Sequence, residues 1–344
     1  MRVAVTGASG FIGSALCRDL REQGLEVVAA VRDRVALDAA RVSVVGEIGP
    51  KVDWRPTLRG CDAVVHLAGR VHVASRADES ALVPYRRVNR DGSVALAEQA
   101  AELGVRRFVF VSTILVNGPD SSRPFLASDV PAPRDPYAIS KLEAELALSD
   151  LAARTGMELV IVRPPLVYGP DVRANFLRLL KLAASGIPLP LAGVPGVRSF
   201  ISRWNLNDLL ILCLRHPAAA GRVILASDGE DISLPDLIRH LAHAMGRPCR
   251  LFSAPPGVLR TIAGSLGARS VVDKLFASLR VDISETRSVL GWNPPVPLRE
   301  GLTRTAVWYS RSRAGALAQH PGADTARTGQ SSAARKSARP PQEA

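Results

Sequence analysis

The chain opens with an apolar run that breaks directly into three glycines spaced at every third residue. The run Val3-Ala4-Val5-Thr6 is typical of a strand, and Gly7, Gly10 and Gly13 follow it at the start of a helical segment. Gly7 permits a tight turn, Gly10 lets backbone amides approach a phosphate, and Gly13 lets the helix pack close to the strand. The helix directs its positive N-terminal end at the same place. The pattern predicts a strand, turn and helix that bind the pyrophosphate of a dinucleotide.

A second motif, Tyr137-Ala138-Ile139-Ser140-Lys141, lies far along the chain. A spacing of four residues on a helix places Tyr137 and Lys141 on one face. An ammonium group beside a phenol lowers the pKa of that phenol, which then exchanges protons near neutrality. The alternative is a surface contact between two helix residues without chemistry. Because the glycine motif is independent of this pair, we interpret the pair as catalytic.

With both motifs, the chain resembles the extended short-chain dehydrogenase/reductase family, which includes nucleotide-sugar epimerases, dehydratases and 4-ketoreductases. The resemblance covers about residues 1 to 310. It implies an α/β fold, a Rossmann-like doubly wound parallel sheet with a smaller C-terminal substrate-binding lobe. Strand-like runs alternate with helical segments as this fold requires, at Arg2 to Thr6, Glu26 to Val31, Val42 to Val45, Ala63 to Leu67, Arg107 to Val111 and Glu158 to Arg163.

The amino-acid composition changes at two points along the chain. Prolines become frequent from Pro164, and the chain after Tyr309 is rich in Ala, Ser, Gly and Arg without periodicity. We therefore expect a dinucleotide-binding domain over 1–165, a substrate-binding lobe over 166–312 and a disordered basic tail over 313–344. No apolar segment approaches the length of about 18 residues that a membrane span needs. Because the first strand begins at Arg2, without room for a signal peptide, a cytoplasmic protein is expected.

The formal net charge of +12 raises the question of a nucleic-acid partner. Basic residues are spread along the whole chain, aromatic residues make up only 5%, and no basic stripe with interleaved stacking residues is present. Nucleic acid is therefore not the expected partner, and part of the charge suits anionic small molecules such as a dinucleotide and a sugar diphosphate. The scattered cysteines are expected in the core, not as metal ligands or disulfides: Cys17, Cys61, Cys213 and Cys249.

The end of the second strand distinguishes NAD from NADP. NAD-binding members of such folds place an acidic residue there, which binds the ribose hydroxyls. By the family register Val31 takes the place of that acid and Arg32 follows it, which favours NADPH because an arginine pairs with the 2′-phosphate. NAD stays open, because a slip of one or two residues brings Asp33 into the position. The resemblance implies further dinucleotide contacts at Ser9, Phe11, Ile12, Glu47, Ile48, Leu67, Ala68, Gly69, Asn89, Val111, Tyr137, Lys141, Pro164 and Val167.

Two of the neighbouring residues have a competing structural interpretation. His66, which ends the fourth strand, is expected to be packed and not catalytic. Asn89 matches a family asparagine whose role is mainly structural, bonding backbone near the fifth strand and the cofactor. A helix-interior asparagine in contact with solvent is the alternative for Asn89.

The fifth strand ends in two hydroxyl side chains, Ser112 and Thr113. The family places its catalytic Ser or Thr here, and the register selects Thr113, with Ser112 beside the substrate. A hydroxyl at this point polarises a substrate carbonyl as negative charge develops on its oxygen, although capping of the strand end is the alternative. The 4,6-dehydratases of the family follow this residue with an Asp-Glu pair, where this chain has Ile114 and Leu115. Aliphatic side chains transfer no protons, so dehydration is not expected.

The later segments resemble the substrate site of the same family. The run from Arg163 to Pro170 resembles an Arg-Pro-x-Asn-Val-Tyr-Gly-Pro segment in which Leu166 replaces the asparagine. Asn175 and Arg198 fall where family members hold the diphosphate of a nucleotide sugar, and Arg198 supplies a cationic hydrogen bond there. The resemblance also implies a homodimer formed through a four-helix bundle, to which Leu142, Leu146 and Leu148 give apolar surface.

The favoured interpretation is an NADPH-dependent reductase of a 4-keto-6-deoxy nucleotide sugar in surface-polysaccharide biosynthesis. In it Tyr137 donates the proton, Lys141 tunes the phenol and binds the nicotinamide ribose, and Thr113 polarises the carbonyl. The alternative is a 4-epimerase of the UDP-glucose type that uses tightly held NAD. A more remote alternative is a non-catalytic, cofactor-sensing member of the fold.

Overall fold

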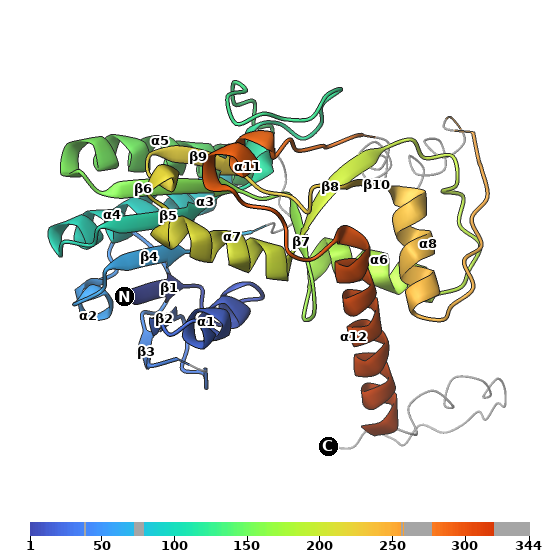
Figure 1. The fold of residues 1–344 in the computed structure, drawn as a ribbon, viewed down its shortest axis with the longest axis horizontal. Helices are drawn as coiled ribbons and strands as arrows, with labels where there is room; N and C mark the ends of the chain where they lie inside the picture. Colours follow the sequence, from blue (N-terminus) through green and yellow to red (C-terminus); the bar gives the residue numbers. More distant parts are fainter. Residues whose placement is uncertain (38, 72–78, 256, 258–276, 320–344) are drawn as a thin grey trace, which may run out of the picture.

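The chain is described by a computed structural model that covers residues 1–37, 39–71, 79–255, 257 and 277–319. It has two lobes that lie next to each other (Figure 1). A large sheet with its helices forms one lobe, and a small sheet packed against three helices forms the other.

Seven parallel strands form the large sheet in the order β3-β2-β1-β4-β5-β6-β9. The strand order reverses between β1 and β4, where the register pairs Thr6 with His66. Ligands of open parallel sheets bind at such a reversal, beyond the carboxyl ends of the strands. The predicted Rossmann-like fold is therefore confirmed. Its first six strands agree with the predicted runs to within a residue at each end: β1 (Arg2–Thr6), β2 (Glu26–Val31), β3 (Arg41–Val44), β4 (Ala63–His66), β5 (Arg107–Val111) and β6 (Glu158–Arg163).

Helices cover both faces of the large sheet, because successive residues of a strand point to opposite faces and both faces are apolar. Val3 and Val5 pack on one face with α1 (Gly13–Glu22) and α7 (Arg203–Arg215). Ala4 packs on the other face with α2 (Arg55–Leu58), α4 (Gly92–Glu102) and α5 (Pro136–Thr155). Shorter elements complete this lobe: α3 (Glu79–Tyr85), the π-helical turn η1 (Arg86–Asp91) and the 3₁₀ turns η2 (Ile114–Val116) and η3 (Pro217–Ala219).

The smaller lobe has its own sheet, with strands in the order β10-β8-β7. β8 (Val197–Ser202) runs parallel to β7 (Leu166–Tyr168) and antiparallel to β10 (Asp231–Ser233). Tyr168 stacks on Phe176 with ring centroids 5.1 Å apart, and Phe200 meets both rings edge-on. This aromatic core is covered by α6 (Ala174–Ala184), α8 (Leu234–Ala244) and α12 (Leu298–Gln319).

The large sheet takes its last strand from the segment that the sequence analysis assigns to the substrate-binding lobe. β9 (Arg222–Leu225) pairs in parallel with β6, and α7, which precedes it, covers the same sheet. The interpretation of 166–312 as one substrate-binding lobe is therefore wrong for the stretch from α7 to β9. The physical reason is that β6 is apolar and buried, so its second edge needs a partner strand. The short helix α11 (Ser284–Leu290) lies next to β9, and residues of both line one pocket.

The predicted tail begins too early, because α12 continues to Gln319 and residues 313–319 are helical. Residues 320–344 lie outside the described part. Cys17, Cys61 and Cys213 are buried as predicted, whereas Cys249 is exposed, because it follows α8 in a loop. Within the described ranges, no helix combines the length and the apolar character needed to cross a bilayer.

Candidate active site

The glycine-rich turn has the shape that its sequence predicts. Gly7 has a φ of +66°, and the amide of Gly10 donates to the carbonyl of Gly7 at 2.9 Å. A Cβ atom at Gly13 would overlap that same carbonyl and would lie 2.9 Å from the Cα of Ala8. No side chain fits at this point of the turn, so an anion can approach the amides and the N-terminal end of α1. This cradle fits the pyrophosphate of a dinucleotide. Next to it, Ser9 is exposed, while Phe11 and Ile12 are half-buried.

The end of β2 presents both residues that bear on the choice of cofactor. Arg32 donates to Asp33 at 2.9 Å, and both side chains are largely exposed. The guanidinium and the carboxylate therefore stand side by side where the ribose of a dinucleotide would be recognised. Further along, Glu47 is exposed, and Ile48 packs close to Gly92, where an added Cβ would lie 2.7 Å from the Ile48 side chain.

The segment after β4 lies directly beside the glycine-rich turn. A Cβ atom at Gly7 would lie 3.0 Å from the backbone nitrogen of Ala68. Leu67 is half-buried, Ala68 is buried and Gly69 is exposed, so this segment offers backbone and not side chains to the turn. The predicted contact residues of β1 and β4 therefore meet at one point of the sheet edge.

Asn89 holds the same segment from the opposite side. Its side chain accepts from the amide of Arg70 at 2.7 Å and donates to the carbonyl of Arg70 at 3.1 Å and to the hydroxyl of Ser140 at 2.9 Å. Pro84 lies in the helix before it, and the helix continues after this proline as the π-helical turn that carries Asn89. Asn89 is fully buried, so the alternative of a solvent-contacting residue is wrong.

The end of β5 brings the two predicted hydroxyls to the site. Thr113 is buried, has extended backbone and accepts from the amide of Leu115 at 3.3 Å, which begins the turn η2. The hydroxyl of Ser112 is buried and has no hydrogen-bond partner among the described residues. A buried hydroxyl without a partner carries a desolvation cost, and a ligand that bonds it removes that cost. Val111 closes the strand with its carbonyl directed at Lys141.

Helix α5 places the tyrosine and lysine because its start is well defined. The side chain of Asp135 accepts from the amide of Ala138 at 2.9 Å, and Pro136 occupies the first helical position. Tyr137 therefore lies in the first turn, where it shares a hydrogen bond with Thr113. One turn later Lys141 donates to the carbonyl of Val111 at 2.8 Å. Its ammonium also lies 4.3 Å from the ring centroid of Phe110.

The pKa of Tyr137 does not follow the prediction from sequence. Burial raises the pKa of this phenol, the neighbouring Asp135 carboxylate adds to the rise, and the hydrogen bond with Thr113 opposes it. Burial lowers the pKa of Lys141 to about 8, against the effect of Glu145. The predicted shift of the phenol pKa toward neutrality is therefore not found in this structure, because burial is the largest effect on Tyr137. Spacing along a helix indicates which groups share a face, but not how deeply they are buried.

The candidate substrate residues of the smaller lobe are more dispersed. Asn175 is exposed in the first turn of α6. Positive φ angles occur just before it, 66° at Asp171 in the preceding loop and 52° at Ala174, the first residue of α6. Arg198 is half-buried on β8, and burial lowers its pKa. Pro164 is buried and accepts from the amide of Ile114 at 2.9 Å, and Val167 is half-buried on β7. The described contacts unite Thr113, Tyr137, Lys141 and Asn89, whereas Asn175 and Arg198 lie on the other lobe.

Several residues of the site escaped the sequence analysis. Tyr85 packs its ring edge-on against Tyr137 at 6.4 Å, and Arg70 lies over Tyr85 at 5.6 Å. Arg203, at the start of α7, lies over the ring of Phe11 at 5.4 Å and donates to the carbonyl of Pro170 at 2.9 Å. Tyr85, Arg70 and Arg203 belong to no motif, because only tertiary packing brings them to the site.

Glu145 was also missed, although its spacing from Lys141 could have indicated it. It follows Lys141 by one helical turn and forms a buried ion pair with Arg163, with two nitrogens of the guanidinium on the carboxylate at 2.5 and 3.0 Å. Arg163 also donates to the side chain of Asn117 at 3.0 Å. The arginine that the sequence analysis reads as part of a substrate segment therefore fixes the catalytic helix to β6.

Comparisons with known proteins identify the family of the chain. Residues 3–225 match the model of the NAD dependent epimerase/dehydratase family. A UDP-glucose 4-epimerase of Vibrio cholerae is 41% identical over 308 residues, which cover 88% of this chain and 94% of that protein. A ceramide reductase of Caulobacter vibrioides is 30% identical, over 89% of this chain and 94% of that protein.

A solved structure of MoeE5 with UDP-glucose and NAD superposes with a TM-score of 0.72 at 28% identity, covering 91% of this chain and all of that one. The chain is an NAD(P)-dependent enzyme that belongs to the NAD dependent epimerase/dehydratase family.

Proposed function

We propose that this enzyme is a nucleotide-sugar 4-epimerase of the UDP-glucose type that works with bound NAD. The observation that carries the proposal is the 41% identity to a UDP-glucose 4-epimerase over nearly the full length of both chains. A second support is local, because Ile114 and Leu115 follow Thr113 and place aliphatic side chains where a dehydratase needs an acid and a base. The reductase that the sequence analysis favours becomes the second candidate.

Named residues would hold the dinucleotide. The amides of the turn around Gly7 and Gly10 and the N-terminal end of α1 would bind its pyrophosphate, and Asp33 would bind the adenosine ribose. Lys141 and the backbone of Ala68 and Gly69 would face the nicotinamide half. Bound NAD supplies a reversible two-electron acceptor for the hydrogen on C4 of the sugar.

Side chains of the protein transfer the proton of the C4 hydroxyl. Burial holds Tyr137 protonated, which is the form that gives a proton to the C4 oxygen in the reducing half of the reaction. In the oxidising half the phenolate takes that proton, and the cationic Lys141, with a pKa of about 8, stabilises the phenolate. The hydroxyl of Thr113 is hydrogen-bonded to Tyr137, and it would donate to the C4 oxygen as negative charge develops there. Epimerisation follows when the intermediate ketone presents its opposite face before it is reduced.

The first prediction separates the two candidate activities. The purified protein, given UDP-galactose and no added dinucleotide, is expected to form UDP-glucose, because bound NAD is regenerated in each cycle. Release of the bound nucleotide by denaturation is expected to yield NAD in near-equal amount to protein. The measurement is sugar analysis by chromatography together with an enzymatic assay of the released nucleotide.

The second candidate predicts a different result, and Arg32 is the observation that favours it. If the protein consumes NADPH stoichiometrically with a 4-keto sugar and carries no NAD, the epimerase proposal fails. Arg32→Ala then weakens NADPH binding by about ten- to a hundredfold, the loss typical of a charge-assisted pair. For the epimerase, the same substitution is expected to leave the amount of retained NAD unchanged.

We further infer a homodimer, and the second prediction concerns this assembly. Val83 on α3 and Leu146 on α5 are apolar and about three-fifths exposed, at 63% and 60%. Both residues lie on the layer formed by α3, η1, α4 and α5. In a dimer, two helices of this layer would pack against the same two helices of a second protomer and form a four-helix bundle. Leu148 is buried in the protomer core, so it contributes no surface, contrary to the prediction from sequence. Light scattering at micromolar concentration is expected to give twice the protomer mass, and Leu146→Glu is expected to shift the mass to that of a monomer.

A further inference from the structure

The imidazole of His66 is fully buried and lies between two hydroxyl groups that come from different elements. Thr6, the last residue of β1, lies 2.6 Å from Nδ1, and Ser93, in the first turn of α4, lies 2.8 Å from Nε2. The ring itself packs against Phe108 and Phe110, with centroids 6.0 and 5.8 Å away. The proposed reaction uses none of these groups, although they form a buried polar triad at the carboxyl ends of β1 and β4.

The direction of each hydrogen bond in the triad of Thr6, His66 and Ser93 follows from the other bonds that the two hydroxyl groups make. The hydroxyl of Ser93 donates its only proton to the carbonyl of Asn89 at 2.6 Å, so it accepts from Nε2 of His66. Nε2 therefore carries the ring proton and Nδ1 is an acceptor. The hydroxyl of Thr6 donates to Nδ1, and its oxygen accepts from the amide of Ala68 at 3.2 Å. The imidazole is neutral and has a single tautomer, in agreement with a pKa that burial and the charge of Lys141 lower to about 3.

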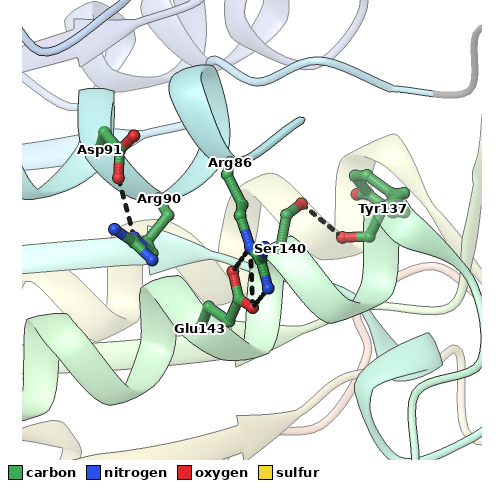
Figure 2. A network of polar contacts seen from close by, with 6 residues as sticks. All are labelled: Arg86, Arg90, Asp91, Tyr137, Ser140 and Glu143. Carbon is green, nitrogen blue, oxygen red and sulfur yellow. Dashed lines mark hydrogen bonds and ion pairs between the residues drawn. The ribbon is translucent and has the colours of Figure 1, made fainter. Parts of the chain in front are cut away.

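The triad forms the middle of a longer path between the two halves of the site. At one end, the segment around Ala68 lies against the glycine-rich turn at Gly7. At the other end, the side chain of Asn89 donates to Ser140. The hydroxyl of Ser140 in turn donates to the backbone carbonyl of Tyr137 at 2.8 Å, as Figure 2 shows. Hydrogen bonds thus run from Ala68, which packs against Gly7, to the backbone carbonyl of Asn89, and from the side chain of the same Asn89 to the first turn of α5.

We propose that His66 is a positioning residue, which fixes the distance between the dinucleotide cradle and the turn that carries Tyr137. Replacement of its ring nitrogens frees β1, β4 and η1 to shift relative to one another, and a shift of this kind changes how the dinucleotide faces the phenol. The proposal rests on the dinucleotide site alone. It holds for an epimerase and for a reductase, so its failure is distinguishable from failure of the proposed function.

The test uses variants that cut the path at two places. His66→Phe keeps the ring and its packing on Phe108 and Phe110 but removes both nitrogens, and Ser93→Ala removes the next link. Each is expected to weaken NAD binding by about tenfold, measured as the Kd from titration of the nucleotide-free enzyme with NAD. Because both variants interrupt one path, the double variant is expected to lose much less than the product of the two. His66→Gln, which keeps a donor and an acceptor, is expected to recover part of the affinity.

Thr305→Val is the matched control. Thr305 on α12 is also fully buried, and its hydroxyl also donates to the carbonyl four residues earlier, at 2.8 Å, but it lies in the other lobe. It is expected to lower the Tm to a similar degree as Ser93→Ala while the Kd for NAD stays unchanged.

Two results would overturn the proposal. One is an unchanged Kd for NAD in Ser93→Ala and His66→Phe despite a lower Tm, which makes the triad a structural feature only. The other is a ¹⁵N spectrum of the enzyme in which the resonance lost in His66→Phe belongs to an Nδ1-protonated ring. If His66→Phe does not fold, Ser93→Ala and the ¹⁵N spectrum still decide the question.

Discussion

Replacement of Tyr137 by phenylalanine is expected to lower kcat by about 10²- to 10⁴-fold, the range that a positioned proton donor contributes. The phenol is buried and shares a hydrogen bond with Thr113. The variant keeps the ring and therefore its edge-on packing with Tyr85. Retained NAD, the Tm and the oligomeric mass are expected to stay unchanged, so the loss falls on the chemical step.

Tyr309→Phe provides the control, because Tyr309 is a buried tyrosine on α12 in the other lobe. It is expected to keep kcat within a factor of a few. Steady-state rates of UDP-galactose conversion measure both variants. Near-normal turnover in Tyr137→Phe would exclude Tyr137 as the proton donor and acceptor.

Removal of the Glu145 carboxylate is expected to produce the largest loss of stability. Glu145 and Arg163 are both almost completely buried, with side-chain exposures of 4% and 5%. Loss of one partner leaves the other as a buried charge without its counter-ion, which typically costs about 3–5 kcal/mol. Glu145→Ala is therefore expected to lower the free energy of unfolding by that amount, measured by urea denaturation. The pKa of Lys141 is expected to fall below its value of about 8, because Glu145 raises it.

The same helix offers a matched control at Glu143. Its carboxylate pairs with Arg86 at 2.5 Å, but the pair is partly exposed, and solvent weakens its contribution (Figure 2). Glu143→Ala is expected to cost less than about 1 kcal/mol. The double variant Glu145→Leu with Arg163→Met is expected to be more stable than Glu145→Ala, because it leaves no buried charge. Equal losses for Glu143→Ala and Glu145→Ala would contradict the assignment of the buried pair.

The sequence predicted those parts of the molecule that depend on local patterns. The turn from β1 to α1 was identifiable because only glycine suits Gly7 and Gly13, and α5 because the four-residue spacing of Tyr137 and Lys141 matches the pitch of a helix. Thr113, Tyr137 and Lys141 lie together because the register of the sheet and the pitch of the helix are both regular. These features recur in any chain with the same motif.

The parts that were missed depend on long-range packing. β9 is only four residues long and finds its partner β6 far back along the chain, so no local pattern marks it. The high pKa of Tyr137 follows from burial by the finished fold, and the path through His66, Ser93 and Asn89 joins residues of three elements. Glu145 alone had a local signal, as an acid one turn beyond Lys141 on the same helix.

The late arrival of β9 affects how a new chain must fold during synthesis. When β6 leaves the ribosome, its outer edge has no neighbour, and the whole first half of the smaller lobe is made before residues 222–225 can pair with it. An apolar strand with an open edge pairs readily with strands of other chains. The nascent protein therefore passes through a period in which aggregation competes with folding, and this period ends only when the chain has returned from the smaller lobe to close the sheet.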